Sequence, residues 1–171
     1  SVNALMAGLS AQCYLTKRKC FLGKVPVISH GGDLPGHSLH ISLSQFAFGN
    51  TYNGFGVTSS ILFRGSRSGG SWYDKHPPCV YAARNKGDMV CDEYPFASTL
   101  NGGRLNYENN TVSLMLLPRR ESGRQGALLK SFYDDARLSI GQPFVSTAIP
   151  VLPSFRMANG RIRLLKINAG R

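Results

Sequence analysis

Acidic side chains are scarce in this chain, which narrows the search for residues that could bind a metal ion or activate water. The 171 residues include 20 Lys and Arg but only 9 Asp and Glu. Two pairs of acids are adjacent, Asp92-Glu93 and Asp134-Asp135. The second pair falls late in an amphipathic segment, where polar positions face water, so we interpret it as a solvated surface pair. The first pair is the better candidate for chemistry.

Asp92-Glu93 lies between Cys91 and Tyr94-Pro95. A disulfide at Cys91 would immobilise the pair, and Pro95 restricts the residue before it to extended geometry. A carboxylate held rigidly in a basic protein can bind Mg²⁺ or Mn²⁺, or can act as a base toward water. The alternative is a pair of acids that faces the dipole of a helix start. These features alone leave both interpretations open.

Glu121 and two histidines are weaker candidates. Glu121 follows Arg119-Arg120 and leads into a helix start, where a carboxylate can face a metal ion while its neighbours bind phosphate. A capping acid in a salt bridge is the simpler alternative. His37 and His40 resemble a metal-binding pair only loosely, because in a strand entry their rings would point to opposite faces. We expect both histidines to be structural or surface residues.

The elements that must position these residues indicate an α+β fold with a small mixed sheet and a few helices. The strongest strand covers residues 111–117, and Pro118 ends it. Ser122 and Gln125 have the spacing of a capping box before a helix with one apolar face. Further strands are expected at 25–28, 39–48, 57–63 and 161–167, and a helix at 2–9.

Length and composition favour one domain. The hydrophobic share of 42% is enough for a core, no run approaches the length of a membrane span, and the first residues lack the pattern of a signal peptide. A loop rich in Gly, Ser and Arg at residues 65–71 separates an N-terminal extension, 1–70, from a second portion, 71–171. We expect the extension to pack on the second portion, because each piece alone would have a thin core.

The net charge of +11 is distributed unevenly. From residue 1 to residue 73 the only acid is Asp33, and residues 142–171 contain none. This asymmetry is typical of a basic groove around an acidic centre, and clustered Lys and Arg favour a polyanion such as nucleic acid. A membrane surface or an acidic protein would also suit the charge.

The four cysteines, Cys13, Cys20, Cys79 and Cys91, indicate two disulfides and an oxidising destination. Three pairings are possible. We favour Cys13–Cys20 with Cys79–Cys91, because both close short loops. A zinc site is disfavoured, since no Cys-x-x-Cys spacing occurs.

Residues 91–99, CDEYPFAST, closely resemble the signature of the NucA/NucB family of secreted deoxyribonucleases, which has an Asp-Glu-aromatic-Pro core. The resemblance continues through a Gly-Gly turn at 101–103, a strand that ends at Pro118 and a helix start at 121–126. It covers about residues 79–133. It implies metal-dependent endonuclease activity on DNA and a compact relative of the ββα-metal nucleases, which would make residues 71–171 the nuclease core.

The resemblance also implies roles for individual residues. Asp92 would be the general base, and Glu93 would assist as a ligand or orient the site. Glu121 and Gln125 would hold the divalent ion, Mg²⁺ or Mn²⁺, directly or through water. Phosphate and DNA binding would fall to basic side chains, namely Arg84, Arg120 and Arg124.

Two residues depart from the family pattern. Asn101 stands where an acid commonly precedes the Gly-Gly turn, and Ser122 replaces the Asn that follows the acid. Gln125 or a water would take over the contribution of that Asn.

The resulting hypothesis is a monomeric secreted DNase or exported toxin, with DNA and an inhibitor or immunity protein as partners and no membrane association. The alternatives are a non-catalytic nucleic-acid-binding module and a nuclease that acts on RNA or on both nucleic acids.

Overall fold

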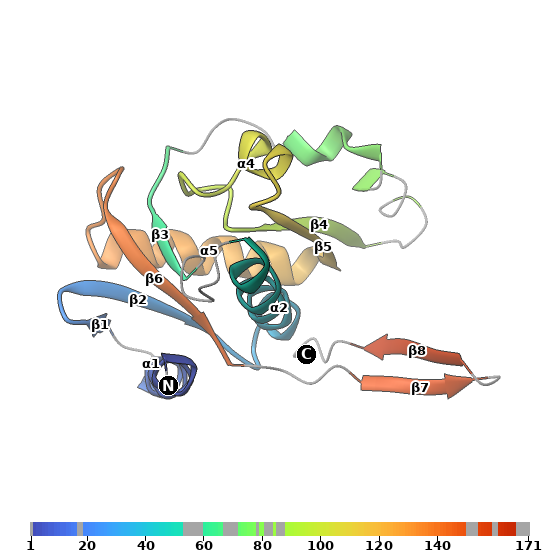
Figure 1. The fold of residues 1–171 in the computed structure, drawn as a ribbon, viewed down its shortest axis with the longest axis horizontal. Helices are drawn as coiled ribbons and strands as arrows, with labels where there is room; N and C mark the ends of the chain where they lie inside the picture. Colours follow the sequence, from blue (N-terminus) through green and yellow to red (C-terminus); the bar gives the residue numbers. More distant parts are fainter. Residues whose placement is uncertain are drawn as a thin grey trace.

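A computed structural model describes residues 2–16, 19–52, 60–66, 72–77, 79–80, 84, 88–149, 154–158 and 161–166. It is an α+β fold, as expected from the sequence. The elements, in chain order, are α1 (Val2–Thr16), β1 (Cys20–Leu22), β2 (Val25–His30), α2 (Pro35–Tyr52), β3 (Ile61–Phe63), η1 (Trp72–Lys75), β4 (Met89–Tyr94), α4 (Arg104–Glu108), β5 (Ser113–Pro118), α5 (Arg119–Asp135), β6 (Pro143–Ala148), β7 (Ser154–Ala158) and β8 (Arg161–Lys166) (Figure 1).

A four-stranded mixed sheet with the order β1-β2-β6-β3 forms the base of the fold. β2 and β6 are parallel, whereas β1 pairs with β2 and β3 pairs with β6 in antiparallel fashion. Because β2 and β3 precede residue 70 and β6 follows it, the two portions of the chain share one sheet. Most of the loop at 65–71 lies outside the described residues.

Helices cover the two faces of this sheet, and strand alternation explains which residue faces which helix. Val27 and Val145 pack with Cys13 of α1 on one face. Ile28 and Phe144, one position along, point to the other face. There they join the main core, whose buried members are Ile28, Ile41, Leu62, Tyr94, Phe96, Leu129, Tyr133, Leu138 and Phe144. This core connects the sheet to α2, α5 and the segment after β4.

β4, β5 and α5 form a ββα unit above this core (Figure 1). β4 and β5 pair antiparallel, with Asp92 opposite Met115. α5 begins at Arg119, directly after Pro118, so the expected capping box is wrong and Ser122 lies inside the first turn. Pro118 has a φ of −59° and no N–H to satisfy, so the strand can pass straight into the helix.

α2 is the main departure from the expected secondary structure. Residues 39–48 were expected as a strand, but they lie within an 18-residue helix. Ile41 is buried while Leu43, two positions on, is 49% exposed, which is incompatible with a strand that buries alternate residues. α2 packs against β5, α5 and β6 and lies near the centre of the molecule (Figure 1).

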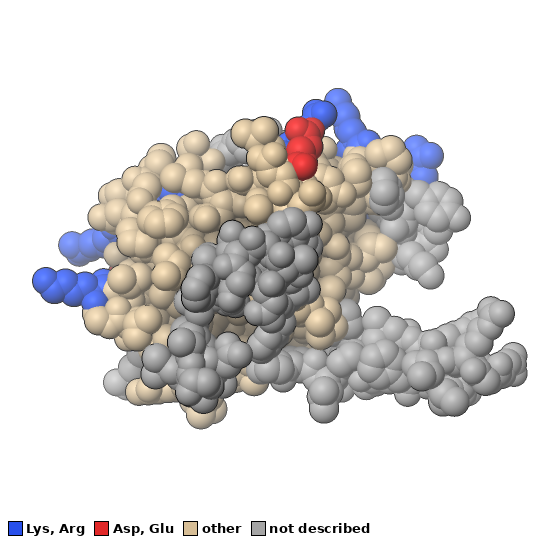
Figure 2. All heavy atoms as spheres, viewed as in Figure 1, with Lys and Arg blue, Asp and Glu red and all other residues tan. Residues whose placement is uncertain are grey.

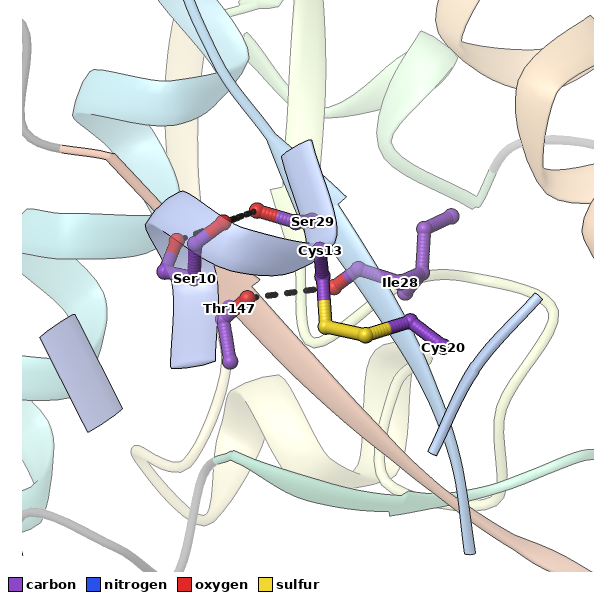
Figure 3. Close-up of a disulfide and its surroundings, with 6 residues drawn as sticks. All are labelled: Ser10, Cys13, Cys20, Ile28, Ser29 and Thr147. Atoms are coloured by element: carbon purple, nitrogen blue, oxygen red, sulfur yellow. Dashed lines mark hydrogen bonds between the residues drawn. A yellow bond between two sulfur atoms is a disulfide. The ribbon is translucent and has the colours of Figure 1, made fainter. Parts of the chain in front are cut away.

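Both expected disulfides are present. Cys13–Cys20 links α1 to β1, beside the contact between Ser10 of α1 and Ser29 of β2 (Figure 3). Cys79–Cys91 joins the segment after η1 to β4, one residue before Asp92. None of the described helices is long and apolar enough to cross a lipid bilayer.

Removal of either disulfide should destabilise the fold. The bridges join residues 7 and 12 positions apart, and loop-closure entropy for rings of this size is worth about 2.5–3 kcal/mol. The double variants Cys13→Ser/Cys20→Ser and Cys79→Ser/Cys91→Ser should each lose roughly this much in urea unfolding. Equal unfolding midpoints for a double variant and the wild type would contradict this prediction.

The stability of the fold should also depend on pH through His30, which is 1% exposed. Burial, and then the charge of nearby His37, lower its pKa from 6.5 to about 3, against the weaker influence of Asp92 and Asp33. Below pH 6.5 the unfolded chain therefore takes up a proton that the folded chain does not. The free energy of unfolding should fall by up to about 1.4 kcal/mol for each pH unit below this value.

His30→Met isolates this effect, because Met fills a similar space without a titratable group. Thermal unfolding measured at about pH 7.5 and about pH 5 should show a larger loss of Tm for the wild type than for the variant. His37 and Asp92 titrate in both proteins and cancel in the comparison. The same loss of Tm in both would show that His30 is not responsible.

Candidate active site

The adjacent acids Asp92 and Glu93 lie on opposite faces of the β4–β5 hairpin, because successive residues of a strand alternate. Asp92 faces α2, where it contacts His37 and His40. Glu93 faces η1 and the glycine turn, where it contacts Trp72 and Gly103. The pair therefore contributes to two different environments.

Asp92 is held between two histidines. His40 Nδ1 donates to Asp92 Oδ2 at 3.0 Å, and His37 Nε2 lies 3.3 Å from Oδ1. Burial disfavours the ionised carboxyl, but these two contacts outweigh it and hold the pKa of Asp92 well below its ordinary value. The Asp92 side chain is 15% exposed, whereas both histidines are buried. Asp92 is thus an ionised carboxylate that solvent can reach.

His37 connects Asp92 to Glu121, the second acid expected from the sequence. Its Nδ1 lies 3.1 Å from Glu121 Oε1, and its backbone N–H donates to the same oxygen at 2.8 Å. Burial opposes the charged form of the ring, but the contacts with the two carboxylates raise the pKa of His37 to about 9. At neutral pH an imidazolium therefore separates two carboxylates.

Glu121 occupies the first turn of α5 and is 4% exposed. Its Oε1 accepts from the first turn of α2, and a Cβ on Gly36 would come within 3.0 Å of both Glu121 oxygens, so the approach of α2 needs glycine here. Oε2 is buried and has no hydrogen-bond partner among the described residues. Gln125, one turn further along α5, is also buried, and its Nε2 is likewise unpartnered within the described residues.

Glu93 lies outside this cluster. Its Oε2 accepts from Trp72 Nε1 at 2.7 Å and its Oε1 accepts from the backbone N–H of Gly103 at 2.8 Å. The carboxyl is 2% exposed, and burial raises its pKa. A Cβ on Gly102 would lie 2.3 Å from the carbonyl oxygen of Phe96 and 2.9 Å from Glu93 Oε1, so the turn closes only with glycine. Of the two roles expected for Glu93, this geometry favours orientation of the site over metal ligation.

Asn101 and Ser122, the two residues that depart from the family pattern, lie in the glycine turn and in the first turn of α5. Asn101 Oδ1 accepts from the backbone N–H of Phe63, which ties the glycine turn to β3. Ser122 follows Glu121 in the first turn of α5, and its Oγ is buried without a hydrogen-bond partner among the described residues.

The expected phosphate-binding residues Arg84, Arg120 and Arg124 are all exposed. Arg120 and Arg124 flank Glu121 along α5. In the view of Figure 2, Lys and Arg side chains of the described residues project at the left edge and at the upper right. The hydrogen bonds and ion pairs of the described residues do not tie these arginines to the carboxylate cluster.

Sequence reasoning missed the two histidines. On a helix, residues three positions apart share one face, so His37 and His40 both reach Asp92. Both were expected to be structural or surface residues, and their exposed fractions of 0% and 1% exclude the surface alternative. A usable signal was present in Pro35, which suits the first turn of a helix and which begins α2.

Comparison with known proteins gives one match. The family model described as Deoxyribonuclease NucA/NucB matches residues 64–147, a stretch that contains β4, β5 and α5 and with them Asp92 and Glu121. His37 and His40 precede the matched stretch. Neither the curated proteins nor the solved structures gave a match. The resemblance seen in residues 91–99 is confirmed by this match to the deoxyribonuclease NucA/NucB family over residues 64–147.

Proposed function

We propose that the chain is a metal-dependent endonuclease that hydrolyses phosphodiester bonds in DNA. One observation carries the proposal beyond the family match. A solvent-accessible, ionised Asp92 and a buried Glu121 with one unpartnered oxygen are brought together, through His37, on a single ββα unit. A hydrolytic site of this kind needs one carboxylate that accepts a proton and another that binds the metal ion. The two roles require different environments, here a solvent-accessible one for Asp92 and a buried one for Glu121.

Asp92 is the proposed general base. When a water oxygen attacks phosphorus, the bond from phosphorus to the leaving oxygen breaks and the water must lose a proton. The contacts with His37 and His40 keep Asp92 ionised at neutral pH, so its carboxylate can accept that proton. The same contacts make it a weak base, because a depressed pKa lowers the driving force for proton transfer. The phosphate therefore needs further activation.

Glu121 fits the role of metal ligand. Its Oε2 is buried without a partner among the described residues, and carboxylate and amide oxygens are ligands that Mg²⁺ and Mn²⁺ accept. Gln125 follows one turn later on the same helix. When bound, the ion would act as a Lewis acid that offsets the charge developing on the phosphate oxygens.

The described residues contain no group of three His, Cys, Asp or Glu side chains that could hold a metal ion. Among the described residues, Glu121 and Gln125 would then be the ligands, and water would supply the others. This is the usual arrangement for Mg²⁺ at phosphate-processing sites.

The charge of the chain suits DNA as substrate. A net charge of +11 attracts a polyanion at long range, and exposed Arg120 and Arg124 lie on the helix that carries Glu121. These arginines would bind phosphate, together with Arg84. Contacts of this kind read no base sequence, so we expect cleavage without strong sequence preference.

We further propose that the chain works outside the producing cell or in a target cell. Two disulfides in one small domain suit an oxidising destination. A DNase of this kind requires restraint near the genome of its producer. An inhibitor or immunity protein that covers this basic surface would be acidic, since charge complementarity governs such encounters.

Plasmid cleavage tests the proposed function. The wild type should cut plasmid DNA with Mg²⁺ or Mn²⁺ and should stop when EDTA is added. Asp92→Asn and Glu121→Gln should each lower kcat by at least about 100-fold, since each removes a charge on which the reaction depends. Asp134→Asn is the matched control, because Asp134 is exposed and pairs only with Lys130 among the described side chains.

Three results would contradict parts of this proposal. Absence of cleavage with either metal would leave a non-catalytic nucleic-acid-binding module. Faster cleavage of RNA than of DNA would change the substrate class. Full activity of Asp92→Asn, in a protein that requires metal, would show that another group accepts the proton.

A further inference from the structure

His40 makes polar contacts through both ring nitrogens, one with each strand of the ββα unit. Nδ1 lies 3.0 Å from Asp92 Oδ2 on β4, and Nε2 lies 2.5 Å from Ser113 Oγ on β5. Ser113 Oγ lies 3.2 Å from Ser44 Oγ, one turn further along α2. The ring is therefore fixed at both edges between its own helix and the hairpin.

These contacts define how the ring acts on Asp92. An ionised carboxylate has no proton to give, so Nδ1 is the donor toward Oδ2. The Ser113 hydroxyl on the opposite edge prevents the ring from turning, and Ser44 Oγ donates to the His40 carbonyl oxygen at 2.7 Å. Gln45 anchors the same stretch of α2 by donating to Tyr94 Oη and to the Ser146 carbonyl oxygen. These contacts hold the His40 ring, and with it the Nδ1–H that donates to Asp92, in one orientation.

Stability alone does not explain this arrangement. His40 is 1% exposed and packs at the edge of the Tyr94 ring, a position where an apolar side chain would avoid the cost of burying a polar group. Among the described residues, the polar contacts of the ring are instead with Asp92 and Ser113. Without this donor, the longer contact of His37 Nε2 with Oδ1, at 3.3 Å, would be left to hold the Asp92 carboxylate among the described residues. A displacement of about 1 Å at a reacting group can cost about 100-fold in rate.

We propose that His40 is a positioning residue for the reaction: it orients the Asp92 carboxylate toward the attacking water while Ser113 fixes the ring. This inference rests on the proposed nuclease function. It makes α2 part of the nuclease site, although the helix lies outside the residues that match the family.

Two substitutions of His40 test its contact with Asp92 and its contact with Ser113 separately. The side-chain nitrogen of Asn can replace Nδ1, so His40→Asn keeps a donor for Asp92 and loses the contact with Ser113. The side-chain nitrogen of Gln reaches the position of Nε2, so His40→Gln keeps the contact with Ser113 and loses the donor. Leu43→Gln is the matched control, because Leu43 is exposed on the same helix.

Steady-state cleavage of a DNA oligonucleotide with Mn²⁺ gives the test. We expect His40→Gln to lower kcat by about 10–100-fold with little change in KM. His40→Asn should recover to within a few-fold of the wild type. Leu43→Gln should match the wild type. Circular dichroism at the assay temperature establishes that each variant is folded.

The outcomes distinguish the two proposals. A wild type that does not cleave DNA under any metal overturns the proposed function and this inference with it. A wild type that cleaves, with equal losses in His40→Asn and His40→Gln, overturns this inference alone, because packing of the ring would then be all that matters. An unchanged kcat for His40→Gln, or a loss confined to KM, overturns it as well.

Discussion

The contact of His37 with Asp92 and Glu121 is the interaction on which the arrangement of the site depends. It joins α2, β4 and α5 at one point, with nitrogen–oxygen distances of 3.3 and 3.1 Å. Two carboxylates this close would repel each other, and the imidazolium between them offsets the repulsion. Burial of such charges is costly, so the cluster contributes more to the geometry of the site than to the stability of the fold.

The two acids of this cluster contrast with the basic character of the whole protein. Asp92 and Glu121 lie on either side of His37 inside a chain whose net charge is +11 and which has only 9 Asp and Glu. A basic surface attracts DNA, and carboxylate oxygens attract a divalent cation. A nuclease needs both, because a phosphodiester approaching bare carboxylates would be repelled. A divalent ion at Glu121, as proposed, would offset this repulsion.

The sequence predicted the elements whose residues follow simple patterns. The amphipathic spacing of Leu129 and Tyr133 identified α5, and short cysteine spacing identified both disulfides. It failed for α2 because the buried face of that helix is polar: His37, Ser38, His40 and Ser44 lie inside with Ile41. Hydrophobic periodicity cannot reveal a helix that faces carboxylates, and the spacing of Leu39, Ile41 and Leu43 imitates a strand.

The two acids of the signature illustrate what adjacency in sequence can and cannot say. A strand directs Asp92 and Glu93 to opposite faces, so Asp92 meets two histidines while Glu93 accepts a hydrogen bond from the turn that follows. Glu93 needs full burial and two N–H donors, from Trp72 and Gly103, to hold that turn. Asp92 is instead partly open to solvent and contacts two histidines of α2. The motif identifies the two carboxylates. Their different environments depend on His37, His40 and Trp72, which are distant in the chain and which the fold brings to them.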